Sequence, residues 1–275
     1  MTALFREKTV IITGASAGVG AACARAFAAQ GANLVLVARG QQALDVIKEE
    51  LSPQTKVVTV AMDVSDTAQC LALLAKAELE FGTVDVLVNN AGMHSRGALE
   101  SVSPLDVGAM VDINIRAPLI LSCAAIPYLR HAGGGGIVMV GSLAGMAPLQ
   151  GAATYCGTKA GLRAFAFALA DEMRGTGIHV GVVSPGPIDT GFIMDEIDKV
   201  EDIVFSQPMS SAGEVADAVL RIAAGDKVEI PMPTASGKML SLGYLFPWLR
   251  RYLRPKLYAM GRKNKDKYRN RQSNE

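Results

Sequence analysis

Tyr155 and Lys159 stand four positions apart, and Ser142 lies thirteen positions upstream of the tyrosine. Side chains at i and i+4 of a helix share a face, so this spacing predicts a phenol close to an ammonium. A free tyrosine has a pKa near ~10, and a fixed neighbouring cation favours the phenolate and lowers that pKa. Such a pair suits proton transfer at an oxygen atom. Taken alone, the same spacing also fits an ordinary pair on a helix surface.

These side chains need a scaffold, and the sequence around them predicts one sheet flanked by helices. Short Val/Ile-rich runs alternate with longer helix-like segments: the runs are 9–13, 33–37, 56–60, 84–88, 136–140 and 179–183, and the segments are 21–27, 41–51, 67–81, 104–131 and 154–174. Near-continuous apolar runs are typical of strands buried on both faces. The alternation therefore predicts an α/β fold, a single Rossmann-type, doubly wound parallel sheet with helices on both faces.

Length and composition agree with one large domain. The chain has 275 residues, of which 50% are hydrophobic and 19% charged, so it can bury a full core. We expect a Rossmann-fold catalytic domain over residues 1–230, with the cofactor half at about 1–140 and the catalytic and substrate half at about 141–230. Residues 231–275 are expected to form a C-terminal extension that is partly helical and basic.

Cysteine usage and hydropathy predict a cytoplasmic protein. The four cysteines form no CxxC motif and are expected to be reduced, mostly buried thiols. Cys156, beside Tyr155, fits either a reactive thiol or a small packing residue. The three histidines have no partners at metal-ligand spacing, so no metal site is expected. No signal peptide is expected at the first residues, and no apolar run is expected to reach the roughly 18 residues of a transmembrane helix.

A glycine-rich turn, Thr13-Gly14-Ala15-Ser16-Ala17-Gly18-Val19-Gly20, joins the first expected strand to the first helix. Glycines let the backbone turn tightly and let a pyrophosphate approach bare N–H groups at a helix N-terminus. The spacing G-x-x-x-G-x-G differs from the common G-x-G-x-x-G fingerprint. A tight turn without a ligand is the alternative interpretation.

Three further motifs accompany this turn in a fixed order. They are Asn89-Asn90-Ala91-Gly92 after the fourth strand, Ser142 with Tyr155 and Lys159, and Pro185-Gly186 after the sixth strand. In order and spacing the chain resembles the classical type of the short-chain dehydrogenase/reductase family over roughly residues 5–225. This resemblance implies an enzyme that transfers a hydride between a nicotinamide cofactor and a CH–OH or carbonyl group, and it implies a homo-oligomer.

The resemblance also implies the roles of four catalytic residues. Tyr155 would be the general acid in reduction and the base in the reverse direction, and Lys159 would hold the nicotinamide ribose and lower the pKa of the tyrosine. Ser142 would hydrogen-bond the substrate oxygen and stabilise developing charge. Asn114 would support a water that links Lys159 to solvent; in isolation it fits equally a helix-interior amide bonding local backbone.

Cofactor contacts follow from the same resemblance. Gly14, Ser16, Gly18 and Gly20, with Val19 packing beneath, would wrap the phosphates. Asp63 and Val64 match the adenine position, although Asp63 also fits a helix N-cap. Asn90, Ala91 and Gly92 would carry the adenosine ribose. Pro185, Gly186, Ile188 and Thr190 would line the nicotinamide, with Tyr155 and Lys159 beside its ribose.

The end of the second strand bears on the choice between NAD and NADP. An acidic residue there binds the ribose hydroxyls of NAD, whereas a 2′-phosphate needs a cation. The sequence reads Ala38-Arg39-Gly40, and Arg39 can form a forked, charge-assisted contact with a phosphate. We therefore expect NADP(H) to be preferred and NAD(H) to be the alternative; a merely solvated Arg39 is the plainer interpretation.

Residues 191–210 are expected to form an apolar lid over the substrate pocket. The apolar residues favour a hydrophobic carbonyl substrate, or they simply pack on their own domain. Residues 250–275 hold ten Lys/Arg against two acids, about +8, which hints at an anionic partner. The run 239–253 suits a surface helix lying on a membrane or over the active site, or a helix packed on its own subunit or its neighbour. No motif indicates nucleic-acid binding.

The expected function is an NADP(H)-dependent carbonyl reductase or alcohol dehydrogenase in the cytoplasm. Peripheral contact with a membrane through the C-terminal extension is the alternative location. A 3-oxoacyl-thioester reductase that acts on acyl carrier protein is the alternative enzyme. A dinucleotide-sensing or scaffold protein is the alternative outside the enzymes. The C-terminal extension, residues 231–275, argues against the tetramer common in the family. We therefore expect a dimer through helices 104–131 and 154–174.

Overall fold

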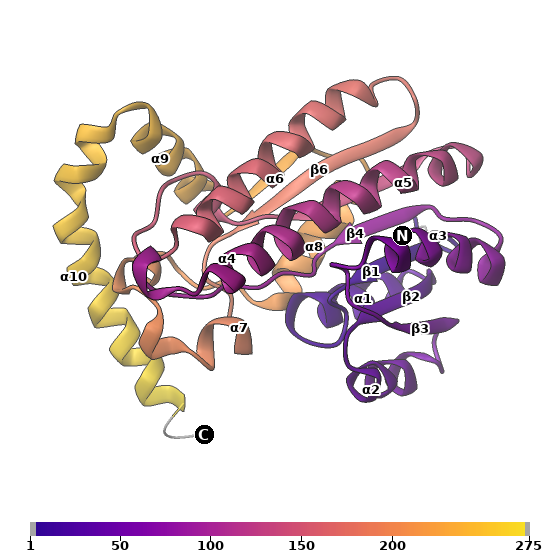
Figure 1. Ribbon diagram of the computed structural model, residues 1–275, viewed down its shortest axis with the longest axis horizontal. Helices are drawn as coiled ribbons and strands as arrows, with labels where there is room; N and C mark the ends of the chain where they lie inside the picture. Colours follow the sequence, from indigo (N-terminus) through magenta and orange to yellow (C-terminus); the bar gives the residue numbers. More distant parts are fainter. Residues whose placement is uncertain (1–3, 273–275) are drawn as a thin grey trace.

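Seven parallel strands form one sheet in the computed structural model, which describes residues 4–272 (Figure 1). The strand order is β3-β2-β1-β4-β5-β6-β7. The strands are β1 (Thr9–Thr13), β2 (Asn33–Ala38), β3 (Val57–Ala61), β4 (Val86–Asn89), β5 (Gly135–Val140), β6 (Ile178–Pro185) and β7 (Glu229–Met232). The outer residues of the expected ranges 1–230 and 231–275, Glu275 among them, lie outside the described residues. The parallel, doubly wound sheet is confirmed.

Helices cover both faces of the sheet (Figure 1). One face carries α1 (Gly18–Ala29), α2 (Gln41–Leu51) and α8 (Ala212–Ala223), and the other carries α3 (Thr67–Phe81), α5 (Ala117–His131) and α6 (Ala153–Glu172). Successive strand residues point to opposite faces, which explains why each strand needs apolar residues throughout. In β1, for example, Val10 and Ile12 enter the first of these cores and Ile11 enters the second.

Shorter elements surround the carboxyl ends of the strands, where the order reverses between β1 and β4. They are η1 (Leu99–Ser101), α4 (Pro104–Val111), η2 (Asp112–Arg116), η3 (Leu143–Gly145), α7 (Gly191–Met194), η4 (Ile197–Lys199) and η5 (Asp202–Ser206). A reversal of strand order leaves a crevice at this edge of an open α/β sheet. Every motif singled out by its chemistry therefore reaches the same edge.

The segment 104–131, expected as one helix, is interrupted by the π-helical turn η2. The expectation that no stretch is apolar and long enough to cross a membrane was also wrong. Within the described residues, the stretch Pro104–His131 is long enough and apolar enough to cross a membrane, by length and composition only. The core helix of a soluble protein can have the same length and apolar composition. In this stretch, Leu121 and Leu129 are fully buried against the sheet.

The C-terminal extension differs from the single surface helix expected over 239–253. It forms two helices, α9 (Thr234–Leu245) and α10 (Pro247–Gln272), that meet at Phe246. Pro247 follows this break, and a residue before proline is pushed out of the α conformation. In Figure 1, α10 runs along the outer side of the molecule, far from α2 and α3, and passes over the segment that follows α7.

The thiols are less buried than expected. Cys23 and Cys70 are buried, but Cys123 is exposed and Cys156 is half-buried. Cys156 Sγ lies 3.9 Å from the Ala147 carbonyl and 3.4 Å from the Leu149 amide nitrogen, and burial raises the pKa of its thiol. These surroundings favour the packing interpretation of Cys156, because a raised pKa keeps the thiol protonated and unreactive.

Candidate active site

The glycine-rich turn packs against the loop that follows β4. Asn90 Nδ2 donates to the carbonyl oxygens of Thr13 (2.8 Å) and Gly14 (3.1 Å), and the Thr13 hydroxyl accepts from the amides of Asn90 and Ala91, both at 3.0 Å. A Cβ on Gly20 would lie 2.0 Å from the Gly14 carbonyl oxygen. Only glycine fits there, so the tight turn is a requirement of the backbone.

The same turn leaves the start of α1 open to an anion. Its N-cap is Ala17, which provides no side-chain cap, and the first helical turn holds no acidic residue. Uncapped N–H groups at a helix N-terminus, together with the helix dipole, form an anion site. Ser16 and Val19 flank the turn half-buried. Gly18 (φ +52°) would place a Cβ 3.5 Å from the Thr190 methyl, so the predicted phosphate turn lies next to the predicted nicotinamide loop.

Asn114 lies in the π-helical turn η2 and is fully buried. Its Oδ1 accepts from the Met93 amide (2.8 Å), and its Nδ2 donates to the Met93 carbonyl (2.9 Å) and to the Thr158 hydroxyl (3.2 Å). The added residue of a π turn directs a side chain inward, and such turns are frequent at functional sites. Asn114 thus ties the loop after β4 to α6, beside Gly92.

Ser142, Tyr155 and Lys159 converge where β5 and α6 face each other. The Ser142 side chain lies close enough to Tyr155 to lower the pKa of the phenol, and Lys159 Nζ lies 5.8 Å from the Tyr155 ring centroid. The ammonium donates to the Val140 carbonyl (2.9 Å). A Cβ on Gly92 would lie 3.4 Å from Asn114 Oδ1 and 3.6 Å from Lys159 Nζ. The four predicted catalytic residues therefore surround one small region.

The expected lowering of the Tyr155 pKa by Lys159 is not found. Burial raises the pKa of Tyr155, and this outweighs the hydrogen bond from Ser142 and the charge of Arg96, which both lower it. Burial also lowers the pKa of Lys159 to about 8. Desolvation disfavours the charged form of both groups, and the shared helix face does not compensate for it. At neutral pH the tyrosine is a protonated phenol and can act as an acid.

The contacts of His94 and Arg96 extend the site beyond the predicted catalytic residues. The His94 ring stacks on the Tyr155 ring, with centroids 4.1 Å apart and planes 11° apart. Arg96 Nη1 donates to His94 Nδ1 (2.8 Å), and Nη2 donates to the Phe192 carbonyl (2.7 Å). Burial and the Arg96 charge lower the pKa of His94 to about 3, so the imidazole is neutral.

Arg96 therefore links the catalytic side of the sheet to the segment 191–206. Its Nε lies 3.5 Å from a carboxylate oxygen of Glu196, and its guanidinium lies 5.6 Å from the Phe192 ring centroid. The arginine side chain is only 6% exposed. In the sequence, Arg96 is visible only as a lone basic residue in the loop after Gly92. Its burial and its partners depend on tertiary packing and could not be predicted.

The remaining predicted cofactor residues line the same edge of the sheet. Arg39 is exposed at the end of β2, and no acidic partner is found for it in the described part of the chain. Asp63 accepts from the Ser65 amide (2.8 Å), while Asp66 caps α3, so the N-cap interpretation of Asp63 was wrong. Val64 is buried. Arg39, Asp63 and Val64 lie beyond β1, away from the tyrosine.

On the other side of the reversal, β6 leads into the predicted nicotinamide residues. Pro185 ends β6, and the Gly186 amide donates to the Met232 carbonyl of β7 (2.7 Å). Ile188 bridges to Ser210, and the extended Thr190 precedes α7. The strand β7, which spans the predicted domain limit at residue 230, thus braces the loop that carries these residues.

The segment expected as a lid, residues 191–210 and called the lid below, packs on itself and on α10. Its apolar core holds Ile193, Ile197, Val200 and Phe205, and Tyr268 of α10 packs against it. Most of the apolar residues thus follow the packing interpretation rather than lining a pocket. Phe192 is the exception: it is 45% exposed, and its ring centroid lies 6.5 Å from that of Tyr155.

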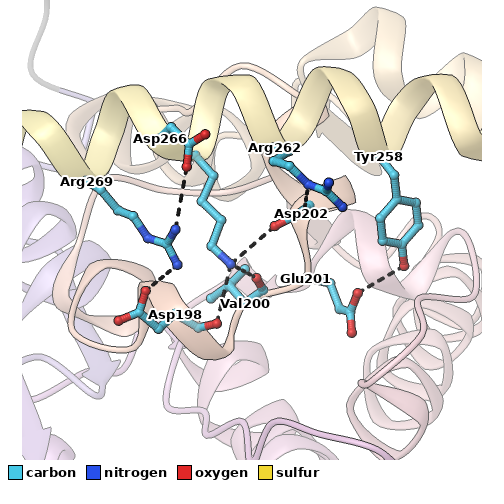
Figure 2. A network of polar contacts seen from close by, with 9 residues as sticks. Asp198, Val200, Glu201, Asp202, Tyr258, Arg262, Asp266 and Arg269 are labelled. Atoms are coloured by element: carbon cyan, nitrogen blue, oxygen red, sulfur yellow. Dashed lines mark hydrogen bonds and ion pairs between the residues drawn. The ribbon is translucent and has the colours of Figure 1, made fainter.

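Figure 2 shows a polar network between the lid and α10. Lys265, 5% exposed, donates to the Val200 carbonyl (2.6 Å) and lies 3.4 Å from a carboxylate oxygen of Asp202. Arg262 also binds Asp202 (3.1 Å), and Arg269 binds Asp198. Part of the positive charge of the tail is therefore matched by acids of the lid.

The fold and this site together define an oxidoreductase with a Rossmann-type sheet. Residues 8–201 match the family described as short chain dehydrogenase. A ketoacyl reductase, HetN, from Nostoc is 34% identical over 215 residues, 77% of this chain and 75% of the relative. Sulfoacetaldehyde reductase 2 from Chromohalobacter salexigens is 36% identical over 187 residues, 67% and 74% of the two chains.

A solved short-chain type dehydrogenase/reductase from Mycobacterium marinum superposes with a TM-score of 0.77 at 27% identity, covering 84% of this chain and 95% of the other. The chain belongs to the short-chain dehydrogenase family. It is an oxidoreductase of the kind that acts on CH–OH groups with NAD(P).

Proposed function

We propose that the protein is an NADP(H)-dependent reductase of carbonyl compounds in which Tyr155 is the general acid. The observation that carries this proposal is the convergence of Tyr155, Ser142, Lys159 and Asn114 beside an open helix N-terminus. The residues present fit a dinucleotide. Gly14 and Gly20 leave no room for side chains where phosphates would approach the backbone, and the amides at the start of α1 lack a side-chain cap.

When bound, a nicotinamide cofactor supplies the hydride; the chain supplies orientation and the proton. Gly14, Ser16, Gly18 and Gly20 would hold the phosphates, and Thr190 the nicotinamide end. The Tyr155 phenol donates its proton to the substrate oxygen, and the Ser142 hydroxyl stabilises the charge that develops on that oxygen. Lys159 offsets the charge of the phenolate that remains after the transfer.

NADP preference rests on Arg39. At the end of β2, a guanidinium without an acidic partner among the described residues can form a forked contact with a 2′-phosphate. Hydrogen bonds to a charged group contribute about 1.5–3 kcal/mol, so Arg39→Asp should raise the KM for NADPH by roughly tenfold to a hundredfold. The KM for NADH should change little. Lys48→Asp, at an exposed position on the neighbouring α2, is the matched control.

The substrate is a carbonyl compound whose apolar part lies against Phe192. A panel of aliphatic and aromatic ketones, aldehydes and 3-oxoacyl thioesters, followed by NADPH absorbance, tests this. Highest kcat/KM for apolar ketones or aldehydes supports the proposal. A clear preference for 3-oxoacyl thioesters would favour the second candidate, a ketoacyl reductase, which the name of the Nostoc relative supports. No turnover of any carbonyl with either cofactor would refute both.

A further inference from the structure

The elbow between α9 and α10 exposes an unusual density of large apolar side chains. Leu245 is 71% exposed, Trp248 67% and Tyr252 79%. Leu242, Tyr244 and Phe246, from the same short stretch, are each exposed by about half or more. Isolated exposed apolar residues need no explanation, but six within eleven residues form a patch, and such patches mark interaction sites.

One face of α10 contacts the lid, and a second face is exposed. Tyr258, Arg262, Lys265 and Arg269 follow i, i+4, i+7, i+11 spacing and contact the lid. Trp248, Tyr252, Lys256, Lys263 and Lys267 follow i, i+4, i+8, i+15, i+19 spacing and are all exposed. With 3.6 residues per turn, this second set lies roughly a third of a turn from the first. We name the second set, with the six apolar residues of the elbow, the aromatic–basic face.

Among the described residues, the charge of this face has no acidic partner. Residues 247–272 contain ten Lys/Arg and a single acid, Asp266. Arg262, Lys265 and Arg269 bind lid acids, but Lys256, Lys263 and Lys267 meet no acidic side chain within residues 4–270. The aromatic–basic face therefore combines apolar anchors with unmatched positive charge.

This combination selects among possible occupants. A second copy of the chain docked on the same face would bring the unmatched lysines of both copies together, which is unfavourable in a two-fold interface. A nucleic acid would satisfy the charge but would leave Leu242 and Leu245 without apolar partners. A bilayer that contains anionic lipid satisfies both, because aromatic and leucine side chains enter the headgroup–acyl boundary while lysines meet the lipid charge.

We propose that the aromatic–basic face docks on the surface of an anionic membrane. The helix lies in the plane of the interface, with the side chains of the elbow inserted and Lys256, Lys263 and Lys267 at the level of the headgroups. The lid-facing contacts of α10 keep the lid attached, so docking holds the lid close to the lipid surface. This surface is independent of the reaction proposed above.

Trp248 is the sole tryptophan of the chain and lies in this face, so its fluorescence tests the inference directly. Vesicles of phosphatidylcholine with 30% phosphatidylglycerol should shift the emission of the full-length protein to shorter wavelength, and lipids brominated near the headgroup end of the acyl chain should quench it. Vesicles of phosphatidylcholine alone should bind far more weakly. Added salt should release the protein, because the lysine contacts are screened.

Two variants separate the apolar and charged parts while leaving Trp248 in place. Leu245→Ser/Tyr252→Ser removes two anchors, and Lys256→Gln/Lys263→Gln/Lys267→Gln removes the lysines. Each cation near an anionic bilayer contributes about 1 kcal/mol, about fivefold in affinity, so the triple variant should bind at least tenfold more weakly in vesicle sedimentation. Lys76→Gln/Leu79→Ser, at exposed positions of α3, is the matched control and should bind normally.

All variants should retain the circular dichroism spectrum and NADPH turnover of the parent protein, which excludes misfolding as the cause. The proposal fails if vesicles leave the emission of Trp248 unchanged. It also fails if sedimentation is equal for the control and the two variants, if a polynucleotide shifts the emission and vesicles do not, or if the shift follows protein concentration and dimer formation instead of lipid.

Discussion

Replacing Lys265 by methionine should loosen the lid without unfolding the domain. The ammonium is buried, donates to the Val200 carbonyl at 2.6 Å and lies 3.4 Å from the carboxylate of Asp202. Methionine fills a similar volume but leaves a lid carbonyl without its donor. An unpaired buried polar group costs about 1–3 kcal/mol, which corresponds to a roughly fivefold to hundredfold rise in the open population of the lid.

Hydrogen exchange read by mass spectrometry measures this opening. Peptides covering 196–206 in Lys265→Met should exchange faster by that factor, while peptides from β1, β4 and β5 should not change, because the lid can open independently of the sheet. Lys263→Met, an exposed position on the same helix, should leave the exchange of the lid unchanged. Equal exchange in Lys265→Met and the parent protein would refute the view that α10 holds the lid.

Three other variants address the turn, the loop after β4 and the buried ammonium. Gly20→Ala should abolish NADPH binding measured by fluorescence titration, because its Cβ would lie 2.0 Å from the Gly14 carbonyl oxygen; near-normal binding would contradict the cradle. Arg96→Met should raise the substrate KM about tenfold or more, since the lid loses its charged hydrogen bond at Phe192; an unchanged KM would show that this contact is dispensable. Burial lowers the pKa of Lys159 from 10.5 to about 8, so the unfolded chain binds more protons between these values and the unfolding free energy should rise with pH across that window. Lys159→Met should lack this rise in urea titrations at pH 8 and pH 10.

The sheet could be predicted because local patterns determine it. A parallel strand buried on both faces needs a continuous apolar run, and β1 and β2 carry such runs with glycine at the following turns. The limits of the six expected strands accordingly lie within a few residues of those observed, whereas β7 and α8 were not expected. The alternation of these elements then leaves few topologies, because crossover connections are right-handed.

Much of the candidate site could also be predicted, because its residues occupy fixed places at strand ends. Ser142 follows β5, and the carboxyl ends of parallel strands share one edge. The direction of the Tyr155 pKa shift could not be predicted. Spacing shows that a cation is near, but the extent of burial, which dominates the shift, depends on the lid and on His94.

The polar contacts between the lid and α10 could not be predicted from the sequence for a related reason. Asp198 and Asp202 are separated from Arg262 and Arg269 by about sixty to seventy residues, and no periodicity connects them. The tail appeared as an excess of cations, and the lid as apolar residues mixed with acids. That the two neutralise each other in part became visible only once α10 was placed across the lid.

Tyr155→Phe is the most direct test of the proposed chemistry. The substitution removes one oxygen and keeps the ring that stacks on His94. Reduction of the best carbonyl substrate by NADPH should fall by about 10²–10⁴-fold, the usual contribution of a general acid, while the dissociation constant of NADPH stays near that of the parent protein. Turnover at the parent rate, with NADPH binding unchanged, would contradict the assignment of Tyr155 as the proton donor.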